Sequence, residues 1–277
     1  MNGCTFDSTA LPATDGDTQS DTDEIHFEDS VKAMVEGERL HVRVPALSHR
    51  RCVELAAQIR LHPEITGYKV APDIGVLGPT YFDTVGSSDD EMRYFDNAVP
   101  AIRAMRSAFH RCGGSPIDAL RLQLDEDWPF GARLLRSTDG RVTYAGAARI
   151  FGEGSEARPH TDRIDWDAPV GRFSGVPIAQ IAVNFYLETA ERGGELCLWS
   201  ERPDRGEYER HRVPGDYSLD QAWLGSPDEI LMPRQGELIL MDAQRVHAVR
   251  PVIQGERVTL SCFILVFGLD RELLIYS

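Results

Sequence analysis

The sequence predicts a mainly β protein with flanking helices, organised as a sandwich or jelly-roll barrel. From about residue 131 to 268, short apolar runs alternate with clusters of turn residues, as in IAQIAVNFYLE, GGELCLW, GELILMD and RVTLSCFILVFG. Regularly spaced short strands with few helices between them are typical of such folds. Helical spacing of apolar residues is confined to the first 130 residues, so we expect those helices to pack outside a sheet.

The N-terminal segment, residues 1–24, is predicted to be a disordered acidic tail. It is rich in Asp, Thr, Ser and Gly, as in TDGDTQSDTDE. Such a composition buries too little apolar surface to offset the entropy of ordering the chain. The alternative is a lid that becomes ordered over a site. We expect residues 25–277 to form one domain.

Residues 25–130 predict a helical and mixed support region for the jelly-roll core at 131–268. LHVRVPA at 40–46 alternates like a strand, and a helix follows with Ser48 as its N-cap. A second helix is expected from about Asp89 to Cys112, where Gly113-Gly114 ends it, and a third begins near Ser115.

Turn signals in the second half predict antiparallel hairpins. STDG at 137–140, ERGG at 191–194 and IQGE at 253–256 separate apolar runs. Gly193 and Gly194 are interpreted as turn glycines that tolerate positive φ, rather than as substrate contacts.

Composition restricts the classes of partner. Lys and Arg total 29 against 44 Asp and Glu, a formal charge of −15. Such a surface repels phosphate backbones and anionic lipids, so we expect neither nucleic acid nor a membrane as partner, and the oligomeric state stays open. No apolar run is long enough to span a bilayer and no signal peptide is recognised. Five scattered cysteines without CxxC spacing favour a reducing cytoplasm.

RPHTDR at 158–163 predicts two converging metal ligands. His160 and Asp162 are two residues apart, and on a strand such residues point to the same face. His247 follows 85 residues after Asp162, at the end of another predicted strand. Two histidines and one carboxylate form the facial triad of non-haem iron(II) oxygenases, which leaves coordination positions open. A surface His-x-Asp pair is the alternative for this motif taken alone.

Arg257 is predicted to return beside the metal strand. It lies ten residues after His247, beyond a strand end and a turn. Thr259 shares its face, whereas Val258 and Leu260 on the opposite face suit a core. A buried guanidinium requires an anion, and a ligand carboxylate supplies one in bidentate geometry. The alternative is an ordinary Arg–Glu surface pair.

The chain resembles the iron(II)/2-oxoglutarate-dependent dioxygenases, particularly their prolyl-hydroxylase-like branch. The resemblance lies in PHTD (159–162), AVNFYLE (182–188), GGELCLW (193–199), PRQGELILMDAQRVHAVRPV (233–252) and GERVTLSCFI (255–264). It implies a double-stranded β-helix, a cupin-like jelly roll buttressed by N-terminal helices. It also implies Fe(II), 2-oxoglutarate and dioxygen as cofactors. His160, Asp162 and His247 would then hold iron, and Arg257, helped by Thr259, would bind the distal carboxylate of 2-oxoglutarate.

The activity implied by this resemblance is hydroxylation of a small molecule by C–H activation. A fainter resemblance extends to free-standing small-molecule members, including halogenases that carry Gly or Ala in place of the carboxylate ligand. Asp162 departs from that pattern and favours hydroxylation, desaturation or cyclisation over halogenation. These outcomes on the same iron stay open. So does a function of another class, a non-catalytic or non-redox cupin-like metal-binding barrel.

Several weaker candidates surround the predicted centre. Asn184 shares a strand face with Gln180, Ala182 and Tyr186, and that face either lines the barrel interior or meets solvent. Tyr144 and Arg149 precede the metal strand and are interpreted as contacts for the co-substrate or an acidic substrate, or else as structural residues. Loop aromatics expected to shape the substrate pocket are Phe151, Trp166, Phe173 and Trp223. Residues 163–179 are a candidate lid, in which Asp165 and Asp167 are expected to be solvated, with support of the metal ligands as the alternative.

Overall fold

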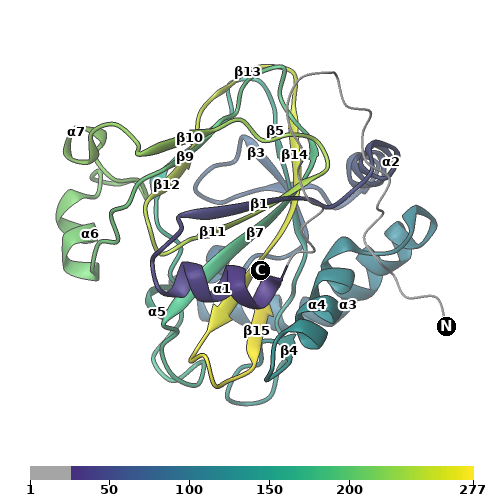
Figure 1. The fold of residues 1–277 in the computed structure, drawn as a ribbon, viewed down its shortest axis with the longest axis horizontal. Coiled ribbons are helices and arrows are strands. Elements are labelled where there is room, and N and C mark those ends of the chain that lie inside the picture. The colour runs from purple at the N-terminus through teal and green to yellow at the C-terminus, as the bar shows by residue number, and fades with distance from the viewer. Residues whose placement is uncertain (1–25) are drawn as a thin grey trace.

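The computed structural model describes residues 26–277, and the predicted tail at 1–24 lies outside the described residues (Figure 1). Two antiparallel sheets face each other, which confirms the predicted jelly roll. Helices α2, α3 and α4 lie together on one side, whereas α6 and α7 lie on the opposite side, beyond β9, β10 and β12 (Figure 1).

The larger sheet has nine strands within residues 26–277. Its main path runs in the order β1 (His41–Pro45), β11 (Glu237–Asp242), β7 (Ala179–Glu188), β14 (Arg257–Val266), β5 (Ala147–Phe151), β3 (Ile74–Leu77) and β2 (Thr66–Gly67). β15 (Leu273–Tyr276) pairs with the far end of β14, and β4 (Ala132–Leu134) pairs with β15.

The smaller sheet carries the predicted metal motif. Its order is β10 (Glu229–Leu231), β9 (Leu196–Leu198), β12 (His247–Val249) and β6 (Ala157–His160). A separate two-stranded ribbon joins β8 (Arg192–Gly193) to β13 (Val252–Gln254). Gly193 and Gly194 both have positive φ there, so their interpretation as turn glycines is confirmed.

Helices are present at the three places where the sequence predicts them, and the described residues also contain helices that were not predicted. They are α1 (Phe27–Val35), α2 (His49–Arg60), α3 (Ser88–Phe109), α4 (Pro116–Asp127), α5 (Ile164–Asp167), α6 (Arg205–His211) and α7 (Gln221–Leu224), with 3-10 turns η1 (Tyr81–Thr84) and η2 (His110–Cys112). The Ser48 side chain accepts a hydrogen bond from the Arg51 backbone, as expected of an N-cap. Gly113 ends the 3-10 turn after α3 in the left-handed conformation.

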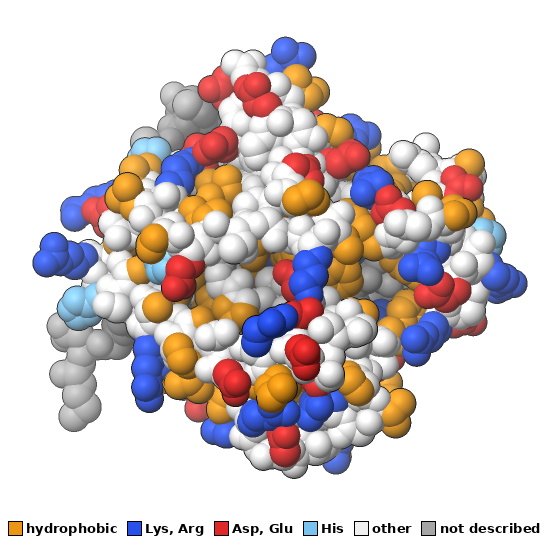
Figure 2. All heavy atoms as spheres, turned by 180° about the vertical axis from the view of Figure 1, so that it is seen from behind, with side chains coloured by type: hydrophobic (Ala, Val, Ile, Leu, Met, Phe, Trp, Pro, Cys, Tyr) orange, Lys and Arg blue, Asp and Glu red, His pale blue; other side chains and the backbone are white. Residues whose placement is uncertain are grey.

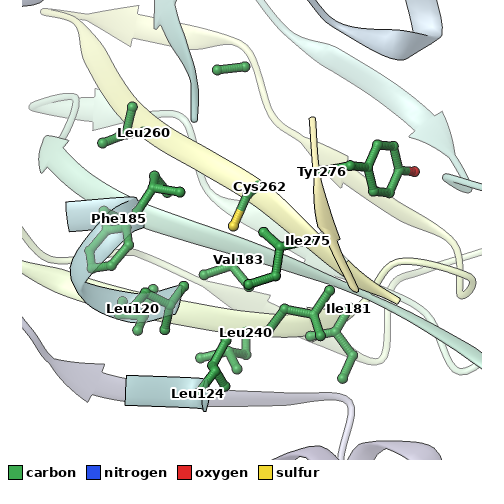
Figure 3. Packing of buried hydrophobic residues seen from close by; sticks show 14 of the residues in the cluster. Leu120, Leu124, Ile181, Val183, Phe185, Leu240, Leu260, Cys262, Ile275 and Tyr276 are labelled. Atoms are coloured by element: carbon green, nitrogen blue, oxygen red, sulfur yellow. The ribbon is translucent and has the colours of Figure 1, made fainter. Parts of the chain in front are cut away.

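The main core lies between the larger sheet and the supporting helices (Figure 3). Val183 of β7, Leu240 of β11 and Leu260 of β14 point to this side, where Leu120 and Leu124 of α4 meet them. Because strand side chains alternate, the residues between these positions turn to the barrel interior. One face of the sheet therefore provides stability, and the other is free to line a site.

The support region is more closely joined to the barrel than the sequence suggests. β1, β2 and β3 come from residues before 130 but are strands of the larger sheet, and β15 extends that sheet beyond 268. The face of the molecule in Figure 2 is hollowed near its centre, and hydrophobic and charged side chains gather around the hollow. Among the helices of residues 26–277, none combines the length and apolarity needed to cross a membrane.

Candidate metal centre

Three side chains converge at one end of the barrel. His160 ends β6 and His247 begins β12, and the two residues are directly paired across these antiparallel strands. The Asp162 carboxylate reaches both rings: Oδ1 lies 3.7 Å from His160 Nε2, and Oδ2 lies 3.2 Å from His247 Nε2. One ligand atom from each residue lies within 4.8 Å of the other two. Ligands held about 2.1 Å from a common ion at right angles would be about 3 Å apart, so the set fits one metal.

Backbone carbonyls fix the orientation of both imidazoles. His160 Nδ1 is 2.7 Å from the Arg158 carbonyl oxygen, and His247 Nδ1 is 3.0 Å from that of Arg245. Each Nδ1 therefore donates its proton to a carbonyl, so Nε2 is the nitrogen that faces Asp162 and that offers a lone pair once the ring is neutral. Both rings thus present the correct nitrogen to a metal.

Ionisation of the three groups also suits metal binding. Burial, together with repulsion from His247, lowers the pKa of His160 to about 4. Burial opposes ionisation of Asp162, but the hydrogen bond from His247 and the charges of both rings outweigh it and hold its pKa at about 2. Burial also opposes protonation of His247, yet the same bond raises the pKa of His247 above its ordinary value. At neutral pH the centre therefore has an ionised carboxylate and at least one neutral imidazole.

The three residues open into a cavity whose far wall is the larger sheet. The inward face of β7 contributes Gln180, Ala182 and Asn184, while β14 contributes Arg257 and Thr259. This is the alternation expected from the sequence, and the polar face of β7 lines the interior rather than meeting solvent. The predicted metal ligands therefore share one cavity with Arg257, Thr259 and Asn184.

Arg257 is buried without an anionic partner. It is 4% exposed, its Nη1 donates to the Gly194 carbonyl at 3.0 Å, and its Nη2 donates to the Tyr186 hydroxyl at 3.1 Å. Its Nε has no hydrogen-bond partner among the described residues, and burial lowers the pKa of the guanidinium. The neighbouring Glu256 pairs instead with Arg60 on the outside. The Arg–Glu surface pair is thus excluded, and the guanidinium fits a ligand carboxylate.

Thr259 and Asn184 line the same cavity as this guanidinium. Thr259 is 1% exposed and lies opposite Tyr186 and Arg149 on the adjacent strands. Asn184 is half-buried and pairs with Ser261. Both side chains line the cavity, so each can hydrogen-bond a bound molecule.

Tyr144 does not belong to this site, and its predicted role is wrong. Its hydroxyl donates to the Gly146 carbonyl at 2.9 Å, and the residue is fully buried in the main core. Gly78 approaches the ring so closely that a Cβ there would lie 2.4 Å from the Tyr144 hydroxyl. Tyr144 therefore packs behind the sheet, away from the cavity lining.

Of the other residues proposed around the metal centre, some line the cavity and others do not. Arg149 and Phe151, on β5, line the cavity. Trp166, Phe173 and Trp223 are absent from its lining within residues 26–277: they pack against Tyr208, Tyr81 and His211, respectively.

Asp167 and Tyr68 also line the cavity. Asp167 was expected to be solvated, but it lines the cavity, and burial, followed by repulsion from Asp162 and Asp165, raises its pKa to about 7. Asp165 forms an ion pair with Arg163. Tyr68 comes from a stretch without any motif. Its contact with the cavity depends on tertiary packing that no local signal encodes.

Comparison with known proteins agrees with this geometry. Residues 145–265 match the sequence model of the 2OG-Fe(II) oxygenase superfamily. This span begins just before β5 and ends within β14, so it contains all three residues of the triad and Arg257.

Two curated proteins resemble most of the chain. One is an L-gamma-glutamyl-L-propargylglycine hydroxylase of Streptantibioticus cattleyicolor, 29% identical over 191 residues, which are 68% of this chain and 68% of that protein. The other is the leucinostatins biosynthesis cluster protein S of Purpureocillium lilacinum, 28% identical over 206 residues, which are 72% of this chain and 82% of that protein.

A solved structure has the same fold. The N-substituted L-amino acid dioxygenase of Burkholderia ambifaria superimposes with a TM-score of 0.61 at 16% identity, covering 91% of each chain. The same enzyme in complex with α-ketoglutarate, which is 2-oxoglutarate, gives a TM-score of 0.59.

Proposed function

Because this chain belongs to the 2OG-Fe(II) oxygenase superfamily, we propose that it hydroxylates a carbon–hydrogen bond of a small molecule. It is an enzyme that uses Fe(II), 2-oxoglutarate and dioxygen. The observation that carries the proposal is the meeting of His160, Asp162 and His247 in the same cavity as the unpaired guanidinium of Arg257.

In this proposal the triad holds the iron. His160 and His247 bind through Nε2, since their Nδ1 atoms are committed to backbone carbonyls, and Asp162 binds through a carboxylate oxygen. When bound, iron together with 2-oxoglutarate supplies the oxidising chemistry that removes a hydrogen from unactivated carbon. The chain itself fixes three ligands on one side and leaves the side toward the cavity open.

Arg257 would bind the distal carboxylate of 2-oxoglutarate. Its fork is oriented by Gly194 and Tyr186, and its remaining hydrogen-bonding capacity faces a pocket from which bulk water is largely excluded. Thr259 and Asn184, which line the same wall, would add hydrogen bonds to the co-substrate or the substrate. An oriented donor in a site of low polarity binds an anion more strongly than the same group in water.

Asp162 supports hydroxylation over halogenation, because a carboxylate at this position fills the place that a halide would need. Desaturation and cyclisation on the same centre differ from hydroxylation only in what happens to the substrate after a hydrogen is removed. The structure of the substrate determines that outcome. The non-catalytic barrel is disfavoured by Arg257, since a buried guanidinium without an anion destabilises a fold that has no ligand to bind.

A small molecule is the proposed substrate class, and the curated hydroxylase named for a modified dipeptide supports it. The formal charge of −15 supports the absence of nucleic acid and of anionic membrane as partners. Residues 25–277 are proposed to act as one domain, because β1 and β3 are strands of the sheet that carries Arg257. A cytoplasmic location is proposed from the thiols, as Cys52, Cys112, Cys197 and Cys262 are all free.

An anaerobic titration tests this proposal. Fe(II) followed by 2-oxoglutarate is added to the protein, and the visible charge-transfer band of the chelated pair is recorded. We expect the band to need both additions, to saturate at one equivalent, and to be absent in His160→Ala. Candidate small molecules are then screened in air for stimulation of succinate formation. A band of full intensity in His160→Ala would overturn the assignment of the triad.

A further inference from the structure

Arg149 presents a second guanidinium to the cavity. It lies on β5, directly opposite Thr259 of β14, so it neighbours the strand that carries Arg257. Its Nε donates to the Tyr68 hydroxyl at 2.6 Å, and its Nη1 donates to Ser261 Oγ. Both partners are neutral, and within residues 26–277 no carboxylate lies at ion-pair distance from Arg149. The cavity therefore contains a second cation that has no anion of its own.

This second guanidinium shares its cavity with the metal ligands. Arg149 lines the same cavity as His160 and Asp162, and its strand β5 directly precedes β6, which ends at His160. An anion bound at Arg149 would thus lie in the space that the metal centre also faces.

Tyr68 places Arg149 on the side of the cavity that meets solvent. Tyr68 belongs to the segment between β2 and β3, and two other residues from this part of the chain, Val70 and Phe82, line the same cavity. Both are exposed, so they mark the mouth. Arg149 therefore lines the same cavity as these exposed residues at its mouth, where a substrate can reach it.

A carboxylate also faces this space. Asp167 ends α5 and lines the cavity, and among the described residues no hydrogen bond or ion pair involves its side-chain oxygens. Burial and the nearby acids Asp162 and Asp165 raise its pKa to about 7, and the more weakly acting charge of Arg205 does not offset them. A positive group of a ligand would be stabilised there.

When Fe(II) and 2-oxoglutarate are bound, the remaining charges of Arg149 and Asp167 indicate which groups the substrate carries. The two positive charges of Fe(II) and that of Arg257 are cancelled by Asp162 and the two carboxylates of 2-oxoglutarate. Arg149 and Asp167 line the same cavity, and neither forms an ion pair among the described residues. Complementarity then requires a ligand with an anionic group and a cationic group.

Building on the proposed function, we propose that the substrate is an amino acid or short peptide whose carboxylate binds Arg149 and whose ammonium group lies against Asp167. This arrangement would fix both ends of the backbone and direct the side chain to the iron. The lining also includes the apolar residues Val70, Ala71 and Phe263, which suit an aliphatic side chain.

Calorimetry on protein loaded with Ni(II) and 2-oxoglutarate tests this, because Ni(II) keeps the centre filled without turnover. The probes are the twenty standard L-amino acids and dipeptides made from them. The tightest binder is then compared with its C-terminal carboxamide and its N-acetyl derivative. Each neutralised group should weaken binding to the wild-type protein by roughly 10- to 100-fold. The acid and the carboxamide should bind Arg149→Met equally, and the amine and its N-acetyl form should bind Asp167→Asn equally.

Arg60→Met is the matched control, since Arg60 pairs with Glu188 and Glu256 on the outside and should keep the full preference for the acid. The inference is overturned if no probe binds, if acid and carboxamide bind the wild-type protein alike, or if Arg149→Met keeps the preference. It is also overturned if Arg149→Met weakens 2-oxoglutarate by more than about 30-fold, a loss of about 2 kcal/mol that would assign Arg149 to the co-substrate. Failure of the proposed function can be told apart from failure of this inference, because binding of Ni(II) and 2-oxoglutarate is measured before any probe is added.

Discussion

Arg257 and Tyr186 form a hydrogen bond of 3.1 Å inside the barrel, between adjacent strands of the larger sheet. The guanidinium also lies over the Tyr186 ring, 4.9 Å from its centroid. Burial raises the pKa of Tyr186, so the phenol remains neutral. Tyr186 therefore orients the guanidinium without neutralising it, and the charge is left for a bound anion.

Replacing Arg257 by Met should weaken 2-oxoglutarate binding roughly 10- to 100-fold, the effect of losing a charge-assisted pair. The unloaded protein should be as stable as the wild type or more stable, because an unpaired buried charge is removed while most of the packing volume is kept. Calorimetry with 2-oxoglutarate and thermal unfolding without it measure the two effects separately.

Replacing Tyr186 by Phe should weaken 2-oxoglutarate binding by only about 3- to 10-fold, because one orienting hydrogen bond is lost while the cation stays. Affinity for the metal should not change in either variant. An unchanged affinity for 2-oxoglutarate in Arg257→Met would contradict the co-substrate role. A large loss of stability in that variant would instead indicate a structural role.

Replacing His247 or Asp162 by Ala should lower the affinity for Ni(II) by at least about 100-fold, because each change removes one of three ligands. Calorimetry under matched conditions measures it. His211→Ala is the control, since His211 stacks on Trp223 and is absent from the cavity lining within the described chain. Equal affinity in Asp162→Ala and the control would rule out a carboxylate ligand.

The parts of the site that the sequence predicts are those governed by strand periodicity. Arg257 and Thr259 share a face of β14 because strand side chains alternate, and His160 and Asp162 converge although β6 ends at His160, where Asp162 follows just beyond the strand. The pattern of β7 also predicts which side chains turn inward. Strand alternation predicts which side chains share a face only within one strand. The prediction that His247, 85 residues after Asp162, joins the same site depends on the family resemblance.

The failures lie where position depends on packing between distant segments. Tyr144 precedes β5, but Gly78 allows its ring to turn into the core rather than toward the metal. Asp167 carries the composition of a solvated loop, yet α5 folds it over the cavity. Tyr68 reaches Arg149 only because β3 pairs with β5, a contact between residues about 80 apart. No local pattern encodes these contacts.

Replacing Gly193 by Ala should destabilise the protein by at least about 2 kcal/mol, since the residue has φ +77° and a Cβ there would lie 2.1 Å from the Pro251 carbonyl oxygen. Gly86→Ala separates strain from collision. Its φ is +78° with nothing within 4 Å, so it should cost only about 1 kcal/mol. Urea unfolding measures both.

Gly193→Ala should also weaken 2-oxoglutarate binding, because the adjacent Gly194 carbonyl accepts a hydrogen bond from Arg257. Gly86→Ala should leave that affinity unchanged. If the two variants lose equal stability, the Pro251 carbonyl oxygen is not what prevents a larger residue at position 193.

Replacing Asp167 by Asn should stabilise the metal-free protein more at pH 8 than at pH 5.5. The pKa of Asp167 is raised from its ordinary 3.8 to about 7 by burial and by repulsion from Asp162 and Asp165, against a weaker opposing effect of Arg205. The folded state therefore holds this proton more tightly than the unfolded state, and stability falls as pH rises from about 4 to about 7. Between pH 5.5 and 7 the loss reaches up to about 2 kcal/mol, at about 1.4 kcal/mol per pKa unit. Asparagine does not ionise, so it removes this loss. Thermal unfolding of both proteins across this range measures the difference, and parallel curves would show that Asp167 titrates at its ordinary pKa.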